Sequence, residues 1–302
     1  MIDMPKLKPT LRQLRVFESV ADELSFTRAS EKLHLSQPAV SIQVKHLEEG
    51  VGLPLFEHTG KRISLTEAGR ILYRCSQNIR SVLQDAGEQI DELMGFQRGK
   101  LKVTVATTAS YFASRILAGF ASRFPQIAIS LDVTNREGLL EQLESNRCDL
   151  VIMGEPPKGK RLKSMPIMEN PLVIIASPEH PLAARRNIPV KTLAAQAFVF
   201  REPGSGTRAA ILRFFEGKNV SIQITMEMTS NEAIKQTVQA GLGLGIVSRH
   251  TVELELETGS LVELDVRHFP LMRKWYLVRR EDKQMSPVAQ HFASYVLDAE
   301  NH

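Results

Sequence analysis

Apolar side chains recur at helical spacing in three short segments near the start of the chain. The first stripe comprises residues 14, 17, 20, 21 and 24, and residues 26, 29 and 33 continue it in the next segment. In the third segment, residues 40, 44, 47 and 51 fall on one face. Ser25 and Ser36 precede the last two segments as helix caps, and Pro38 stands in a first turn, where its missing N–H costs nothing. The pattern predicts a helix-turn-helix.

The polar face of the third helix carries side chains suited to DNA, because the second helix of a helix-turn-helix lies in the major groove. Ile42 stands in the middle of this face, where a thymine methyl group would be its natural partner. Gln37 and Ser41 can hydrogen-bond base edges, whereas Lys45 and His46 suit phosphates. The predicted DNA-contacting set is Ser36, Gln37, Pro38, Ser41, Ile42, Lys45, His46, Thr59, Lys61 and Arg62. A helical subdomain that never meets DNA would show the same periodicity, and the residues alone leave that alternative open.

Two further elements follow this motif. Residues 57–65 read as a two-stranded wing with Gly60 at its tip, which would offer Thr59, Lys61 and Arg62 to the DNA backbone. Thr66 then caps a long helix that runs to about residue 94. Its apolar positions alternate in steps of three and four, as in a coiled-coil seam: Ala68, Leu72, Cys75, Ile79, Val82, Ala86, Ile90 and Leu93. We expect this helix to form a dimer, although packing on its own domain would also explain an apolar stripe.

From residue 100 onwards the pattern changes to alternating strands and helices. Strands are predicted over residues 101–105, 127–133 and 149–153, and a second series over 172–176, 198–200 and 222–228. The two series resemble each other: residues 131–152 match 226–247 in the order strand, polar turn, helix and strand, and the loop 107–110 corresponds to 204–207. The repeat predicts two similar α/β lobes that face each other across a cleft.

Hydroxyl-rich loops lead into the helices of both lobes. Free N–H groups and the helix dipole favour an anion at a helix N-terminus, and Arg208 adds positive charge nearby. The predicted effector-binding set is Thr107, Thr108, Ser110, Asn135, Arg136, Arg201, Ser205 and Thr207. The alternative is that these residues simply cap their helices, as Ser, Thr and Asn do in any α/β protein.

Enzyme chemistry finds little support in the sequence. The glycines of residues 241–245 imitate a dinucleotide-binding loop, but they follow a helix and lead into a strand, the reverse of the required order. They are better explained as a helix end and a tight turn. Glu202 beside Arg201 suggests an ion pair rather than an acid catalyst, and we find no nucleophile or metal-binding constellation. We therefore expect no enzyme activity, no metal and no cofactor.

Charge and cysteine content limit how this chain can bind DNA and where it acts. The chain has 302 residues with 38 Lys and Arg against 34 Asp and Glu, and residues 1–70 carry ten basic and nine acidic side chains. DNA affinity must then come from where the basic side chains are placed and from two copies of the DNA-binding region, not from a basic tail. Cys75 and Cys148 stand apart, which suits a reducing cytoplasm rather than a disulfide framework. The sequence shows no signal peptide and no apolar run long enough to span a membrane, so we expect a cytoplasmic protein.

The motifs together resemble the LysR-type transcriptional regulators over nearly the full length. The match rests on the segments 26–33, 35–41, 54–56 and 65–69. The resemblance implies an α+β multidomain protein with a winged helix-turn-helix over residues 1–66, a linker helix over 67–95 and an effector domain over 96–302. That domain would fold like type 2 periplasmic binding proteins, with lobe 1 formed by about residues 100–165 and 266–302 and lobe 2 by about 166–265. Residues 275–278 would be the strand that returns to lobe 1.

Within that family, residues 40–49, 135–137, 150–157 and 200–208 resemble the Calvin-cycle operon regulators, which control carbon-fixation genes such as those for RuBisCO. The chain departs from the family pattern at two positions that bear on DNA binding. Many members carry Arg where this chain has Ile42, and Arg where it has His58. The resemblance implies a homotetramer built as a dimer of dimers. We expect it to bind a two-fold A·T-rich duplex, with RNA polymerase as a further partner. We expect an anionic effector, a phosphorylated metabolite or a nucleotide, to close the lobes and shift the DNA-binding heads. A cytoplasmic solute-binding protein and a regulator of another operon remain the alternatives.

Overall fold

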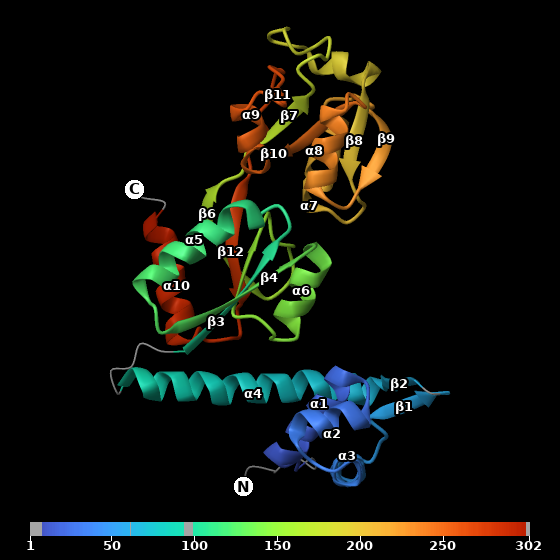
Figure 1. Ribbon diagram of the computed structural model, residues 1–302, viewed down its shortest axis with the longest axis vertical. Helices are drawn as coiled ribbons and strands as arrows, with labels where there is room; N and C mark the ends of the chain where they lie inside the picture. The colour runs from blue at the N-terminus through green and yellow to red at the C-terminus, as the bar shows by residue number, and fades with distance from the viewer. Residues whose placement is uncertain (1–7, 61, 94–98, 300–302) are drawn as a thin grey trace. The chain divides into compact units, whose positions relative to one another are not determined.

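The computed structural model describes residues 8–60, 62–93 and 99–299 (Figure 1). The chain forms two compact units, residues 1–87 and 88–302. Helix α4 begins in the first unit and ends in the second. The linker boundary predicted at residues 95 and 96 lies outside the described residues.

The first unit is a winged helix-turn-helix. Its elements are α1 (Leu11–Glu23), α2 (Phe26–Leu33), α3 (Gln37–Val51), β1 (Phe56–Thr59), β2 (Arg62–Leu65) and the start of α4 (Glu67–Leu93). β1 and β2 pair antiparallel as the predicted wing. The caps are those read from the sequence, since Ser25 and Ser36 each accept a hydrogen bond from a backbone N–H of the following helix. Leu24 departs from the predicted apolar stripe, because it ends α1 in the left-handed conformation (φ 45°) and is half exposed.

The apolar faces of the three helices meet in one core, which includes Phe17, Ala29 and Leu47. The wing is fixed to α3 by Glu48, whose Oε1 accepts a hydrogen bond from the Leu55 N–H at 2.7 Å. α4 then starts against the same turn. A Cβ atom on Gly69 would lie 2.1 Å from the Leu55 carbonyl oxygen, so only glycine permits this close approach.

The first turns of α4 are tied to α1 by polar contacts. Arg80 pairs with the buried Glu18 at 2.8 Å, and the Ser76 hydroxyl donates to the same carboxylate. Farther along the helix the apolar positions are exposed within this chain, among them Val82 and Ile90. That exposure is compatible with the predicted coiled coil, and dimerisation stays a prediction.

The second unit consists of two lobes, each built on a five-stranded sheet. The sheet of lobe 1 has the order β4-β3-β5-β12-β6. Its elements are β3 (Gly99–Ala106), α5 (Ser110–Arg123), β4 (Ile127–Thr134), α6 (Arg136–Glu144), β5 (Leu150–Met153), β6 (Leu162–Glu169), β12 (Lys274–Arg280) and α10 (Pro287–Ala299). β12 is the predicted returning strand, and it lies antiparallel to both β5 and β6.

Lobe 2 has the sheet order β11-β7-β10-β8-β9. Its elements are β7 (Leu172–Ala176), the 3-10 helix Val190–Ala195, β8 (Ala197–Arg201), α7 (Gly206–Gly217), β9 (Gln223–Met228), α8 (Asn231–Gln239), β10 (Leu244–Ser248), the 3-10 helix Arg249–Thr251, α9 (Glu253–Glu257) and β11 (Val262–Glu263). Read from the opposite edge, this order matches that of lobe 1, with β9, β8, β10, β7 and β11 in the places of β4, β3, β5, β12 and β6. The repeat predicted from the sequence is therefore a repeat of topology.

The positions at which the chain passes between the lobes differ from those predicted. β6 pairs with β12 as far as Glu169, so lobe 1 extends past residue 165 and the chain crosses at Asn170 and Pro171. It crosses back at residues 271–273, where Leu271 bridges Leu172 of lobe 2, rather than near residue 265. β6 has one buried residue among eight, which leaves no apolar alternation from which to predict its length.

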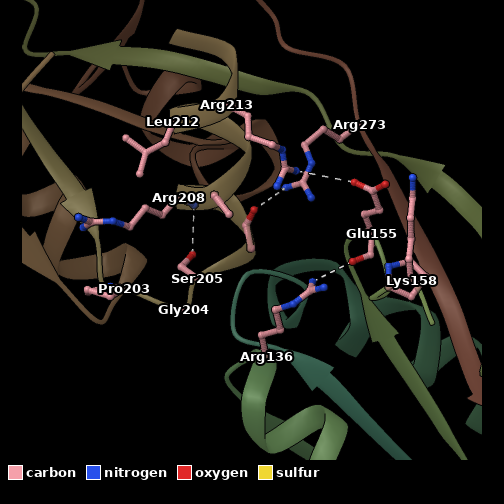
Figure 2. Close-up of a pocket in the computed structure, with 13 residues that line it drawn as sticks. Arg136, Glu155, Lys158, Pro203, Gly204, Ser205, Arg208, Leu212, Arg213 and Arg273 are labelled. Atoms are coloured by element: carbon pink, nitrogen blue, oxygen red, sulfur yellow. Dashed lines mark hydrogen bonds and ion pairs between the residues drawn. The ribbon is translucent and has the colours of Figure 1, made fainter. Parts of the chain in front are cut away.

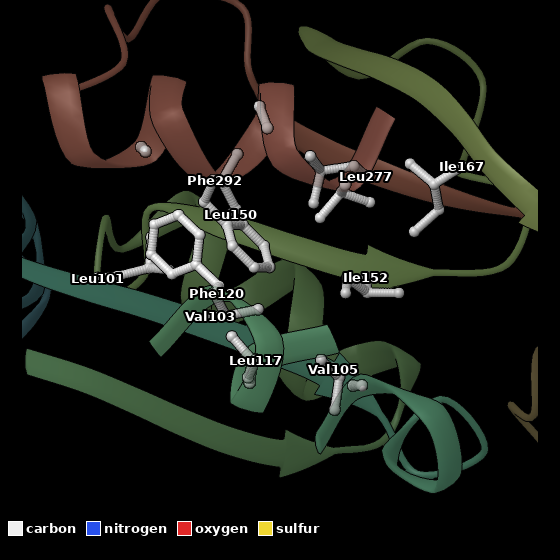
Figure 3. Close-up of a cluster of buried hydrophobic side chains, with 14 of the residues drawn as sticks. Leu101, Val103, Val105, Leu117, Phe120, Leu150, Ile152, Ile167, Leu277 and Phe292 are labelled. Atoms are coloured by element: carbon white, nitrogen blue, oxygen red, sulfur yellow. The ribbon is translucent and has the colours of Figure 1, made fainter. Parts of the chain in front are cut away.

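Lobe 1 illustrates why these segments become strands and helices. Leu101, Val103 and Val105 alternate along β3 and are all buried, and they pack against Phe120 of α5 and Phe292 of α10 (Figure 3). The rings of Phe120 and Phe292 meet edge to face with centroids 5.1 Å apart. This core fixes the ends of the strands, from which the cleft residues project.

Candidate DNA-reading surface and effector cleft

The predicted DNA-reading residues share one exposed face of α3. Gln37, Pro38, Lys45 and His46 are exposed there, and the Ile42 side chain is 51% exposed. Val40, Val44 and Leu47 of the same helix are buried on the opposite face. Ile42 therefore contributes nothing to this core and lies in solvent on the exposed face.

Local hydrogen bonds arrange two members of this face. Gln37 Nε2 donates to the Ser41 hydroxyl at 3.0 Å, which orients the amide carbonyl away from Ser41. Ser36 caps the helix through the Ala39 N–H at 3.3 Å, so its hydroxyl is engaged in structure. In the wing, Arg62 is exposed on β2 and Thr59 ends β1, whereas Lys61 lies outside the described residues.

The second unit brings most of the predicted effector residues together. Those lining a small cavity between the lobes are Thr107, Thr108, Asn135, Arg136, Arg201, Ser205 and Thr207. We call this the inner cavity. Its volume of about 50 Å³ corresponds to one or two water molecules at roughly 30 Å³ each. Ser110 does not line it, and its hydroxyl donates to the Thr107 carbonyl oxygen at 2.7 Å.

Arg201 fills the space between the lobes and is fully hydrogen-bonded. Its Nε and Nη2 donate to both carboxylate oxygens of Glu202 at 2.7 and 2.9 Å, which is the ion pair predicted from the sequence. Its Nη2 also donates to the Thr107 hydroxyl at 3.3 Å, and its Nη1 to Thr108 and Asn231 at 3.4 and 3.2 Å. A guanidinium has five N–H donors, and all five are engaged here. An anion reaches Arg201 only by displacing one of these partners.

Two other predicted residues act as helix caps in this arrangement. The Asn135 side chain accepts from the Gly138 N–H at 2.9 Å, and Ser205 accepts from the Arg208 N–H at 3.4 Å. These are the hydrogen bonds that the capping alternative predicts, although both residues also line the inner cavity. The Gly241 turn also behaves as expected, since Gly241 follows α8 with φ 77° and β10 comes next.

Sequence reasoning missed several residues of the inner cavity, and three of them lie near the segments that cross between the lobes. They are Asn170, Arg273 and Trp275. Within the described part of the chain, Asn170 Oδ1 and Trp275 Nε1 are buried with no hydrogen-bond partner. Buried polar atoms without partners are rare in native proteins, and here both belong to residues that line the inner cavity. No local sequence motif predicts these residues, because they reach the cavity only when the chain returns to lobe 1 through β12.

A larger cavity opens directly outside the inner one, with a volume of about 650 Å³ (Figure 2). We call it the outer cavity. It shares Arg136, Ser205, Gly206 and Arg273 with the inner cavity. Its charged lining residues are Arg136, Glu155, Lys158, Arg208, Arg213 and Arg273. This volume lies within the range of roughly 300–1,000 Å³ typical of small-molecule sites.

Glu155 is the acidic residue among these cations. Its carboxylate lies 3.8 Å from Arg213 Nη2, and its backbone carbonyl accepts from Arg136 Nη1 at 2.8 Å. Burial lowers the pKa of Arg136 and of Arg273, while the charge of Glu155 raises both and the charge of Arg213 lowers both. The arginines remain protonated, but the shifts record positive charges that are partly removed from water and incompletely compensated.

Arg208 is separate from this group, because it bonds the Arg201 carbonyl oxygen at 2.7 Å and pairs with Glu227 at 2.6 Å. Among the described residues, no group of three His, Cys, Asp or Glu side chains is placed to hold a metal ion. No helix in that same part of the chain has both the length and the apolar character needed to cross a membrane.

Comparison with known proteins covers both units. Residues 11–70 match the family described as "Bacterial regulatory helix-turn-helix protein, lysR family", and residues 95–301 match "LysR substrate binding domain". The chain is 53% identical to the RuBisCO operon transcriptional regulator of Allochromatium vinosum over 288 residues, 95% of each protein.

Solved structures of related regulators resemble this chain as well. The regulatory domain of CcmR from Synechocystis PCC6803, in complex with 2-PG, is 40% identical with a TM-score of 0.65, covering 68% of this chain and 99% of that one. Full-length CbnR complexed with its target DNA is 19% identical with a TM-score of 0.71, covering 96% and 99%. At that identity CbnR shows a likeness of fold.

Proposed function

Because the chain belongs to the LysR family of bacterial transcription regulators, we propose that it activates carbon-fixation genes in response to a small anionic metabolite bound between its lobes. The observation that carries this proposal is the identity of 53%, across 95% of both proteins, with a regulator named for the RuBisCO operon. Such a protein acts in the cytoplasm, on duplex DNA and without a catalytic step.

For DNA reading, α3 enters the major groove with Ile42 against a thymine methyl group and with Gln37 and Ser41 against base edges. Lys45, His46 and the wing contact phosphates and fix the position of the helix. The exposed face of α3 supports these roles. Two copies, joined through the exposed seam of α4, present two heads to a two-fold A·T-rich site, and two dimers form a tetramer.

For effector sensing, the proposed ligand is a phosphorylated metabolite. CcmR, whose regulatory domain is 40% identical, was solved with 2-PG. Arg136 and the hydroxyl groups of Thr107, Thr108, Ser205 and Thr207 offer donors to a phosphate in the cleft. Because Arg201 is saturated, it joins such a site only after the ligand changes how the lobes meet. The ligand then shifts the heads and the bend of the DNA, provided that it prefers one lobe arrangement.

The DNA half of the proposal is tested by selecting binding sites from a random duplex pool with the full-length protein in moderate salt. An A·T-rich inverted repeat, spaced for two heads, is the expected result. A retained pool without sequence preference and with steep salt dependence would mean phosphate binding alone and would contradict the assigned reading face.

The sensing half is tested on the selected duplex with 2-PG and with sugar phosphates. Trp275 is the single tryptophan of the chain and lines the inner cavity, so its fluorescence reports ligand binding directly. We expect a saturable fluorescence change together with an altered footprint. If phosphorylated metabolites change neither the fluorescence nor the footprint, the sensing half is wrong while DNA reading stands.

A further inference from the structure

The outer cavity holds a cluster of charge that the proposed site does not explain. Arg136, Lys158, Arg213 and Arg273 line it around one carboxylate, that of Glu155. Figure 2 shows Glu155 between Arg136 on one side and the neighbouring Arg213 and Arg273 on the other. Lys158 and Arg213 belong to neither the predicted effector set nor the inner cavity.

The two cavities differ greatly in what they can hold. The inner cavity, at about 50 Å³, is too small for a metabolite, whereas the outer one, at about 650 Å³, is of ordinary ligand size. Arg136 and Arg273 line both. An anionic group held by these two arginines therefore leaves the rest of its molecule in the outer cavity, beside Arg213 and Lys158.

The carboxylate already in the outer cavity is weakly held. The contact between Glu155 and Arg213 is 3.8 Å long, and both side chains are more than half exposed. An exposed ion pair of this kind contributes little to stability. A ligand phosphate can form shorter, bidentate contacts with an arginine and carries more charge than a carboxylate. It can therefore displace Glu155 at little cost.

On these grounds we infer that the outer cavity is a second anion subsite. It binds the second charged group of an effector that carries two separate anionic groups, and Glu155 is the internal counter-ion that this group displaces. Glu155 then determines specificity, because its negative charge repels ligands that cannot engage Arg213 in exchange. This inference rests on the proposed function, since it assumes that an anionic effector enters the cleft.

The test compares fructose 1,6-bisphosphate with fructose 6-phosphate on the full-length protein, with Trp275 fluorescence as the readout. A second charge-assisted contact contributes about 1.5–3 kcal/mol, so the bisphosphate should bind on the order of 10- to 100-fold more tightly. Arg213→Ala should remove most of that ratio and leave the affinity for the monophosphate nearly unchanged. Arg186→Ala is the matched control, because Arg186 is an exposed arginine of lobe 2 that lines neither cavity.

Glu155→Gln provides an independent arm, since it removes the charge and keeps the shape. Removing a like charge at roughly 6 Å should raise the affinity for both sugars about 3- to 30-fold, and more for the monophosphate, which has no second group to displace the Glu155 carboxylate. Equal binding of the two sugars, or an unchanged ratio in Arg213→Ala, would overturn the second subsite alone. If neither sugar binds while the melting temperature is normal, the phosphorylated effector of the proposed function is wrong as well.

Discussion

Removing the Arg201 side chain should destabilise the effector domain by a predictable amount. Arg201→Ala leaves the Glu202 carboxylate, 21% exposed, without its bidentate partner and frees the hydroxyl groups of Thr107 and Thr108. Breaking a buried ion pair by removing one partner costs about 3–5 kcal/mol. Because Glu202 keeps some contact with water, we expect the lower end, about 3 kcal/mol. In a domain of roughly 200 residues each kcal/mol lowers Tm by about 2–4 °C, so the expected decrease is about 6–12 °C.

Trp275 makes the measurement specific to this unit. It is the only tryptophan, is 2% exposed and lies on β12 of lobe 1, so heating exposes it only when the effector domain unfolds. Thermal unfolding followed by tryptophan fluorescence therefore reports on Arg201→Ala without a contribution from tryptophan in the DNA-binding unit. Arg186→Ala, at an exposed position of the same lobe, should leave Tm within about 1 °C of the wild type.

The double variant Arg201→Ala, Glu202→Ala distinguishes the cost of an unpaired charge from the cost of lost side-chain packing. Removing both partners eliminates the unpaired charge, which is the costly part of the single change. The double variant should therefore be more stable than Arg201→Ala, by about 1–3 kcal/mol. A decrease below about 2 °C in the single variant, or a double variant that melts lower still, would refute the stabilising role assigned to the pair of Arg201 and Glu202.

Three further predictions concern other parts of the chain. Ile42→Ala should relax preference at one thymine and leave non-specific affinity nearly intact in a site selection, and a uniform loss across sequences would contradict direct readout. Gly69→Ala should lower the melting temperature of the DNA-binding unit, because its Cβ would lie 2.1 Å from a backbone carbonyl oxygen, whereas Gly50→Ala, where nothing lies within 4 Å, should raise stability by up to about 1 kcal/mol. Burial raises the pKa of the Cys148 thiol to about 12, so at pH 8 about one molecule in 10⁴ is a thiolate there. Iodoacetamide should therefore leave Cys148 unmodified in the native protein, and its modification would refute the burial of Cys148.

The sequence was sufficient wherever local chemistry decides the structure. The caps at Ser25 and Ser36, the buried face of α3 and the wing all follow from periodicity and turn residues, and the structure has them where they were predicted. The repeat of the two lobes was also visible, because strand, polar turn and helix recur in the same order. The ion pair of Arg201 with Glu202 could be read from adjacent residues.

What the sequence could not supply depends on contacts between distant segments. Arg273 reaches the cleft only because the chain returns to lobe 1 through β12, and no motif near it indicates an anion site. Glu155 looks like an ordinary loop carboxylate until Arg213, on α7, lies beside it. The saturation of Arg201 was equally hidden, since its partners Thr107 and Thr108 stand more than ninety positions away.

The size of the regulatory shift sets a condition on the ligand. To move a two-state equilibrium from 1:99 to 99:1, a ligand must prefer one state by about 5.5 kcal/mol. Rearranging the Arg201 network involves about 3 kcal/mol, and the exposed pair of Glu155 with Arg213 at most about 1 kcal/mol. These contacts are lost when the ligand binds, so they count against it and cannot supply the preference. The preference must come from contacts that the ligand makes with both lobes at once, which a group held by Arg136 in lobe 1 and a second group held by Arg213 in lobe 2 would provide. A ligand with a single anionic group should then shift the footprint only partly, even at saturation.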